Sequence, residues 1–296
     1  MPKFIDPFVI KLSQPIRKEI PNKTTLNGLS FAVKSIIAVA TLPSNFGNLS
    51  WDSNHATPNK YHASCIETLL NAGAILQGTL HTSEFAFDIT GVNAYGIPVN
   101  PKVNNGMPGG SSSGCVSAVA SNLIDFALGT DTGGSIRIPA AYCGVWSLRP
   151  TNHLISTEGV LAVGKEYDTV GIIAKNADIL TRVSGELLPN QELPLPLKKI
   201  YVIKEAIDLC NEDVKHIFEE RIEQLNKSGI PLQMITMDEI TEEQDPLLKG
   251  LNGWRDASIL LLNSTWKTLG QWIEKNIPDW RDNNDKLTSE VRENFN

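Results

Sequence analysis

The pattern of apolar and polar positions predicts alternating strands and helices in the first part of the chain. Residues 26–37, LNGLSFAVKSII, form a turn followed by an apolar run, which is typical of a buried strand. Residues 63–74 have the apolar spacing of a helix and reach Gly73, a helix stop, and residues 74–78 predict a short strand. This succession of helix, glycine and strand is typical of an α/β sheet.

Further elements are predicted along the rest of the chain. Residues 1–24 are interrupted by prolines and lysines, so we expect them to lie over the surface. The other predicted elements, in chain order, are a helical turn at 84–87, a loop at 91–101, a helix at 115–120, strands at 144–150 and 168–174, a connection at 195–197, a strand at 200–203, a helix at 212–224, a strand at 231–237 and helical segments at 259–273.

Two loops of small residues, GGSSSG at 109–114 and GTDTGGS at 129–135, flank the apolar run 115–120. Glycine is favoured where φ must be positive or where a ligand must approach the main chain, so we expect the loops to form two walls of one pocket. Two plain turns between core elements are the alternative. A phosphate-binding loop is a weaker alternative, because neither the dinucleotide fingerprint nor the P-loop motif occurs here.

The two loops, together with the IRIPA sequence that follows the second one, resemble the amidase signature. That family hydrolyses carboxamides with a Ser-cisSer-Lys triad on an α/β fold. The resemblance covers residues 25–180 well and the rest weakly. It implies a mixed twisted sheet with helices on both faces, in one amidase-type domain spanning 1–296, with 186–296 as a less certain α/β portion.

By this resemblance, Ser135 is the nucleophile and Ser111, preceded by a cis peptide bond, relays its proton to Lys34. Lys34 also stands out by itself, because a lysine at the end of an apolar run is costly unless it is paired or functional. A lysine that reaches out to water is the alternative. To accept a proton Lys34 must be neutral, which requires burial to lower its pKa.

Other residues of the loops receive supporting roles from the same resemblance. The backbone N–H groups expected to form the oxyanion hole are those of Thr132, Gly133, Gly134 and Ser135. The side chains expected to support the loops are those of Ser112, Ser113, Asp131 and Arg137. One departure is Ser35, where the family usually has aspartate; a carboxylate there would help to orient the lysine.

Composition narrows the possible partners and the compartment. The net charge is −7 and there is no block of lysines or arginines, which argues against a nucleic-acid partner. No zinc-type cysteine spacing occurs, and we expect neither a metal nor a cofactor; the four cysteines are interpreted as reduced core residues. With no signal-peptide pattern and no run of about 18 apolar residues, we expect a cytoplasmic protein without a membrane partner.

The substrate is expected to be a small amide. Segments 26–34, 46–48 and 156–160 look closest to the plant-type short amidases that hydrolyse indole-3-acetamide. The alternatives are an impaired, amidase-like docking module and the glutaminase-type subunit of a tRNA-dependent amidotransferase.

Family members continue with a C-terminal segment that returns to the sheet, and nothing here resembles it. We therefore expect a shortened variant, a fragment or a chain that another chain completes. An exposed sheet edge would then favour a homodimer.

Overall fold

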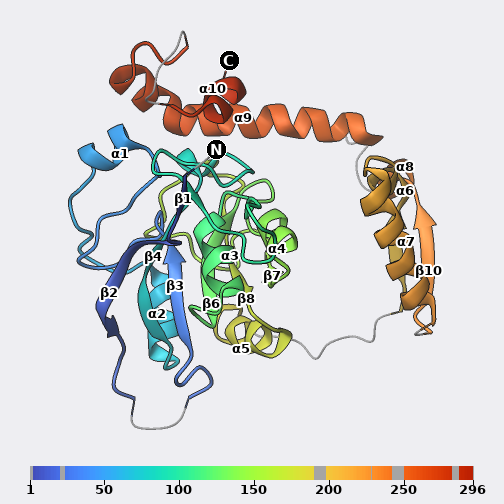
Figure 1. Ribbon diagram of the computed structural model, residues 1–296, viewed down its shortest axis with the longest axis horizontal. Helices are drawn as coiled ribbons and strands as arrows, with labels where there is room; N and C mark the ends of the chain where they lie inside the picture. The colour runs from blue at the N-terminus through green and yellow to red at the C-terminus, as the bar shows by residue number, and fades with distance from the viewer. Residues whose placement is uncertain are drawn as a thin grey trace. The chain divides into compact units, whose positions relative to one another are not determined.

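The computed structural model describes residues 3–20, 24–189, 198–227, 229–241, 250–281 and 287–295 (Figure 1). The chain divides into two compact units, one of Met1–Asn190 with Leu261–Asn296 and one of Gln191–Leu260, here called unit 1 and unit 2. All the predicted site residues lie in unit 1. The single amidase-type domain stays a prediction, and the predicted connection at 195–197 lies outside the described residues.

Unit 1 is built on a mixed six-stranded sheet in the order β2-β4-β3-β6-β8-β7. Its strands are β2 (Phe8–Ile16), β3 (Ser30–Lys34), β4 (Ile75–Leu80), β6 (Phe126–Asp131), β7 (Trp146–Leu148) and β8 (Thr169–Ala174). Strand β3 runs parallel to both β4 and β6, whereas β2, β7 and β8 pair antiparallel with their neighbours. A short parallel pair, β1 (Phe4–Ile5) with β5 (Ile97–Pro98), lies outside this sheet.

The central strands are buried on both faces, which explains why their sequences are almost continuously apolar. Large side chains such as Phe31 and Phe126 belong to one core cluster, and their rings stack 5.2 Å apart. Their small neighbours Ala32 and Ala127 belong to a second cluster on the opposite face. Successive side chains of a strand point to opposite faces, so the two clusters mark the two faces of one sheet.

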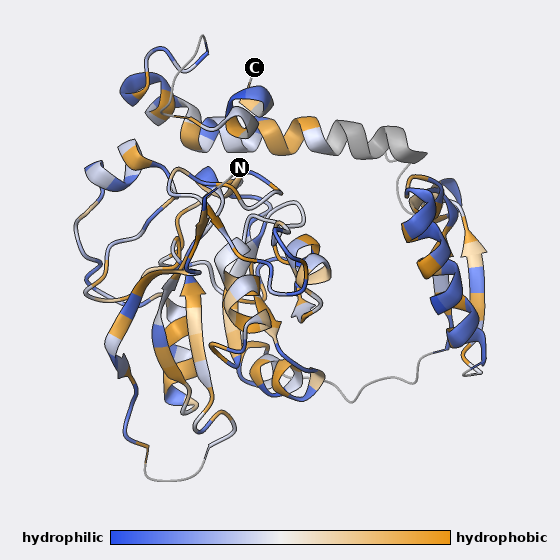
Figure 2. Cartoon of the chain, viewed as in Figure 1, coloured by the Kyte–Doolittle hydropathy of each residue, from blue (hydrophilic) through white to orange (hydrophobic). Residues whose placement is uncertain are grey.

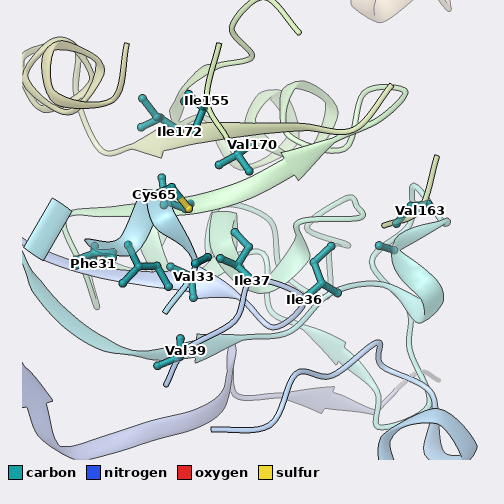
Figure 3. Packing of buried hydrophobic residues seen from close by; sticks show 14 of the residues in the cluster. Phe31, Val33, Ile36, Ile37, Val39, Cys65, Ile155, Val163, Val170 and Ile172 are labelled. Carbon is teal, nitrogen blue, oxygen red and sulfur yellow. The ribbon is translucent and has the colours of Figure 1, made fainter. Parts of the chain in front are cut away.

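Helices cover both faces of the sheet, as predicted. Helices α2 (Ser64–Asn71) and α5 (Ala177–Leu187) pack in the cluster of large side chains, part of which Figure 3 shows. Helices α3 (Ser113–Ala120) and α4 (Arg137–Cys143) pack in the second cluster, to which α3 and the central strands contribute small residues such as Ala118, Ala32 and Ala127. The small residues let α3 approach the sheet closely, and the first turn of α3 therefore lies near the end of β3.

The expectation that residues 1–24 only lie over the surface is wrong. Residues Phe8–Ile16 form β2, an edge strand that pairs antiparallel with β4 through the register Phe8↔Leu80 and Ile16↔Leu76. Proline lacks an N–H and is tolerated on an edge strand, which accommodates Pro15. Lys11 and Pro15 are thus compatible with a strand at the end of the strand order.

The remaining elements of unit 1 are short, apart from α9. They are α1 (Leu49–Asn54), the 3₁₀ helix η1 (Glu84–Ala86), which replaces the predicted helical turn, α9 (Gly250–Asn276), whose first residues belong to unit 2, and α10 (Ser289–Phe295). Unit 2 holds β9 (Ile200–Ile203), α6 (Lys204–Asp208), α7 (Glu212–Lys227), β10 (Leu232–Ile235) and α8 (Met237–Thr241), with β9 and β10 parallel.

The two units differ in hydropathy. In Figure 2 the strands of the large sheet are mostly orange, whereas α7 is mostly blue. The strands predicted at 200–203 and 231–237 and the helix predicted at 212–224 are confirmed, with boundaries shifted by a few residues. Within the described part of the chain, no helix has both the length and the apolar character needed to cross a membrane.

Candidate active site

Lys34 is the last residue of β3, and its side chain is fully buried. Its ammonium nitrogen donates hydrogen bonds to Ser111 Oγ at 2.7 Å and to Thr130 Oγ1 at 2.9 Å. The alternative of a lysine that reaches out to water is therefore wrong. Two hydroxyl partners satisfy a buried polar group that would otherwise be costly.

Burial lowers the pKa of Lys34 from its ordinary value of 10.5 to about 8. Weaker charge interactions with Cys115, Asp168 and Asp131 act in the opposite direction. A substantial fraction of the amine is consequently neutral near pH 8. A neutral lysine that touches a hydroxyl oxygen can accept its proton, which is the property required of a general base.

Ser111 lies in the first glycine-serine loop, and its peptide bond with Gly110 is cis, as the resemblance implies. Its carbonyl oxygen accepts hydrogen bonds from Ser83 N at 3.0 Å and Thr82 Oγ1 at 3.2 Å. A Cβ at Gly110 would lie 2.5 Å from the carbonyl oxygen of Asp88, so only glycine fits there without displacing backbone. The segment after β4 thus holds the backbone of Ser111 in place.

The two glycine-rich loops meet, as expected for the walls of one pocket. Ser112 N donates to the carbonyl oxygen of Ser135 at 3.0 Å, and Ser112 Oγ donates to the carbonyl oxygen of Thr130 at 3.2 Å. A Cβ at Gly129 would lie 2.7 Å from Ser112 Oγ, which shows how closely the Ser112 side chain packs against the second loop. Ser135, the predicted nucleophile, is therefore held directly beside the loop that carries Ser111.

Asp131 organises the second loop from inside. Its carboxylate accepts hydrogen bonds from Gly134 N at 2.8 Å and Ile136 N at 3.1 Å, and from both Nε and Nη2 of Arg137 at 3.0 and 2.9 Å. Burial favours the neutral acid, but the hydrogen bonds and charge of Arg137 outweigh it and lower the pKa of Asp131. This geometry is consistent with the supporting role of Asp131 and Arg137, which stays a prediction.

The four N–H groups predicted for the oxyanion hole differ in their availability. That of Gly134 already donates to Asp131. Those of Thr132, Gly133 and Ser135 have no hydrogen-bond partner among the described residues. Three neighbouring unpaired donors in a glycine loop can bind a developing negative charge, whereas the N–H of Gly134 is used inside the loop by Asp131.

The Ser35 hydroxyl donates to the carbonyl oxygen of Asn45 at 2.8 Å and not to Lys34, whose second hydroxyl partner is Thr130. Ser113 is buried, and its hydroxyl has no partner within the described residues. No three His, Cys, Asp or Glu side chains in the described ranges are grouped as metal ligands would be.

Sequence reasoning missed the contribution of Thr130 and underused Asp168. Asp168 accepts Thr132 Oγ1 at 2.6 Å and the backbone N–H of Val163 at 2.8 Å, so it ties the second loop to the segment before β8. The sequence does carry a pattern for Asp168, since the residues Asp-Thr-Val-Gly at 168–171 place a carboxylate directly before a buried strand. For Thr130, a threonine within an apolar strand carries no distinctive signal.

Comparison with known proteins now decides the family. A family model described as Amidase matches residues 11–292, nearly the whole chain. The chain belongs to the amidase family. A solved structure described as the crystal structure of amidase superimposes with a TM-score of 0.74 at 24% identity, covering 92% of this chain and 59% of that one, which confirms the predicted fold class.

Three curated relatives show where the sequence similarity is concentrated. Amidase 1 of Oryza sativa is 44% identical over 187 residues, 63% of this chain and 41% of that protein. Amidase 1 of Arabidopsis thaliana is 33% identical over 279 residues, 86% of this chain and 65% of that protein. The translocon at the outer membrane of chloroplasts 64 of Pisum sativum is 42% identical over 164 residues, 55% of this chain and 28% of that protein. The chain therefore spans less than two thirds of these relatives, and the predicted likeness to plant-type amidases is confirmed.

Proposed function

We propose that this amidase-family chain hydrolyses a small carboxamide to a carboxylic acid and ammonia. The observation that carries the proposal is the 2.7 Å hydrogen bond between the buried Lys34 Nζ and Ser111 Oγ, in a loop bonded to that of Ser135. A buried amine beside a hydroxyl relay is what is needed to activate a serine at neutral pH.

The proposed reaction starts with neutral Lys34. Ser135 Oγ attacks the carbonyl carbon of the amide while its proton passes to Ser111 Oγ, whose own proton passes to Lys34 Nζ. The oxyanion of the tetrahedral intermediate is bound by the N–H groups of Thr132, Gly133 and Ser135. The C–N bond then breaks as Lys34 returns a proton through Ser111 to the leaving nitrogen, which departs as ammonia. Water repeats the sequence on the acyl-enzyme and releases the acid.

The substrate class is part of the same proposal and is supported by the names of two relatives. Similarity to two proteins named Amidase 1 favours a small amide, and we propose an aryl- or indole-acetamide such as indole-3-acetamide. The predicted cytoplasmic location and homodimer also stay predictions.

Ammonia release from a panel of aryl- and indole-acetamides tests the proposal. Wild type is expected to release ammonia, and Ser135→Ala and Lys34→Met are expected to reduce the rate at least about 10³-fold, since each removes a member of a unit that acts together. Ser13→Ala on the exposed part of β2 is the matched control and is expected to keep full activity. Equal ammonia release by wild type and Ser135→Ala would refute the mechanism.

A second candidate is a docking module without catalysis, favoured by the 42% identity to the chloroplast translocon protein. It predicts that folded wild type releases no ammonia from any amide of the panel. The same assay therefore separates the two candidates.

A further inference from the structure

A second cavity in unit 1 shares none of its lining residues with the proposed catalytic set. It has a volume of about 470 Å³, within the range of small-molecule sites. Its walls come from the N-terminal segment, the loop between β3 and α1, the residue after β4 and the loop before β5. The lining residues are Lys3, Ile5, Val9, Asn45, His81, Ala94 and Tyr95.

His81 is the most buried polar group of this cavity, with 8% of its surface exposed. The amide nitrogen of Asn93 lies 3.4 Å from His81 Nδ1 and donates to the carbonyl oxygen of Thr82 at 2.9 Å. An amide nitrogen only donates, so Nδ1 is the acceptor and the proton of the neutral ring sits on Nε2. Burial lowers the pKa of His81 to about 4, which keeps the ring neutral at pH 7.

The Nε2–H group is left without a partner among the described residues. Nε2 is not one of the fully enclosed polar atoms that lack a partner in the described part of the chain, so it is reached from the cavity and can donate to a molecule bound there. Because Asn93 occupies the Nδ1 side, Nε2–H is the polar group that the ring offers to the cavity.

The other lining residues contribute one positive charge and an apolar surface. Lys3 is exposed and contributes a positive charge, whereas Ile5, Val9 and Ala94 are apolar. Two neighbouring acids already have partners: Asp6 accepts the backbone N–H of Phe8 at 2.8 Å and its charge also acts on His81, and Asp52 accepts Tyr95 Oη–H at 2.8 Å. Neither carboxylate lines the cavity.

We propose that this cavity binds a small carboxylate with an apolar substituent, held by the Lys3 ammonium and His81 Nε2–H, with its apolar part against Ile5 and Val9. A carboxylate accepts from both donors at once, and its charge is matched by the lysine. The apolar wall gives preference to an acid with a hydrocarbon tail over a bare inorganic anion.

Two polar lining residues, Asn45 and His81, are hydrogen-bonded to the segments that carry the proposed catalytic residues. The backbone of Asn45 exchanges hydrogen bonds with Ser35, the residue after Lys34. The carbonyl oxygen of His81 accepts Gly114 N at 3.0 Å, at the end of the loop that carries Ser111. Two lining residues of the cavity are thus hydrogen-bonded to the segments that carry Lys34 and Ser111.

Calorimetric titration with 3-phenylpropionate at pH 7 tests the site, with the uncharged 3-phenylpropan-1-ol as the matched compound. His81→Phe removes the donor and keeps a ring, and is expected to weaken binding about tenfold. Lys3→Ala changes an exposed side chain, which leaves the fold intact, and is expected to weaken binding several-fold. Lys60→Ala, at another exposed lysine, is the control and should bind like wild type.

Ser135→Ala separates this cavity from the catalytic pocket, whatever the activity of the chain proves to be. Undiminished binding to Ser135→Ala, with weakened binding to Lys3→Ala, supports the site. The proposal is overturned if wild type binds no 3-phenylpropionate, if the alcohol binds as well as the acid, or if Lys3→Ala binds like wild type.

Discussion

Replacing Lys34 by methionine should change how the stability of the protein depends on pH. Methionine has a similar length and no charge, so it removes the cost of burying an amine that is protonated in water. The fall of the Lys34 pKa from 10.5 to about 8 corresponds to about 3 kcal/mol, the penalty that wild type carries at pH 7. Against this, the substitution would leave the hydroxyls of Ser111 and Thr130 without their lysine partner, at a cost of about 1–3 kcal/mol that does not vary with pH.

The sign follows from proton binding. Because the pKa of Lys34 is lower in the folded state, the unfolded chain binds more protons between pH 8 and 10.5, and wild type gains stability as the pH rises through that window. The variant lacks this gain. The free energy of unfolding of Lys34→Met minus that of wild type should therefore fall by about 3 kcal/mol between pH 7 and 10.5.

Urea unfolding at pH 7, 8, 9 and 10, followed by near-ultraviolet circular dichroism, measures this difference. Groups that titrate equally in both proteins cancel in the subtraction. Lys60→Met, at an exposed position, controls for the loss of one positive charge. A difference between Lys34→Met and wild type that stays constant over the whole range would refute the reasoning, since it would mean that burial does not perturb the lysine.

Three further predictions concern the loops and the helices beside them. Asp131→Asn should lower the free energy of unfolding by about 3 kcal/mol at pH 7 in urea titrations. Because the pKa of Asp131 is lowered in the fold, the loss should shrink as the pH falls below 3.8 and the wild-type carboxylate becomes protonated. Gly114→Ala should destabilise by about 3 kcal/mol, since its Cβ would lie 2.5 Å from His81 N, whereas Gly185→Ala in α5, where the Cβ meets nothing within 4 Å, should stabilise by about 0.5–1 kcal/mol. Equal changes in thermal melting for the two glycine variants would contradict this. If the proposed mechanism holds, Thr130→Val, which removes one hydroxyl from Lys34, should lower kcat about tenfold with little change in KM, and an unchanged kcat would exclude a role for Thr130 in positioning the lysine.

The centre of the candidate site could be predicted because its residues break the rules of an ordinary core. A lysine at the end of an apolar strand and two glycine-serine loops are costly features, so each points to a reason for its presence. The hydrogen bond of Lys34 to Ser111 and that of Ser112 to Ser135 show that these features lie together. The sheet was predictable for a similar reason, since residues 30–34 and 169–174 are apolar over lengths that suit buried strands.

The parts that were missed depend on pairing between distant segments. Strand β2 contains Lys11 and Pro15, which argue against a strand until its place at the sheet edge is known. Thr130 resembles any strand threonine until the lysine of β3 is placed beside it. The second cavity joins residues near positions 3, 45, 81 and 94, and no local pattern connects segments so far apart.

The distribution of the cysteines makes the opening of unit 1 observable by thiol chemistry. Three of the four, Cys65, Cys115 and Cys143, are buried in unit 1, and burial raises the pKa of each to about 12. A thiol must be both accessible and ionised to react, so a disulfide reagent should label these three only when unit 1 opens. Cys210 lies in unit 2 and is partly exposed. Cys210 should therefore be modified rapidly. The slower labelling of the other three cysteines would then report the rate at which unit 1, which carries Lys34 and Ser111, opens.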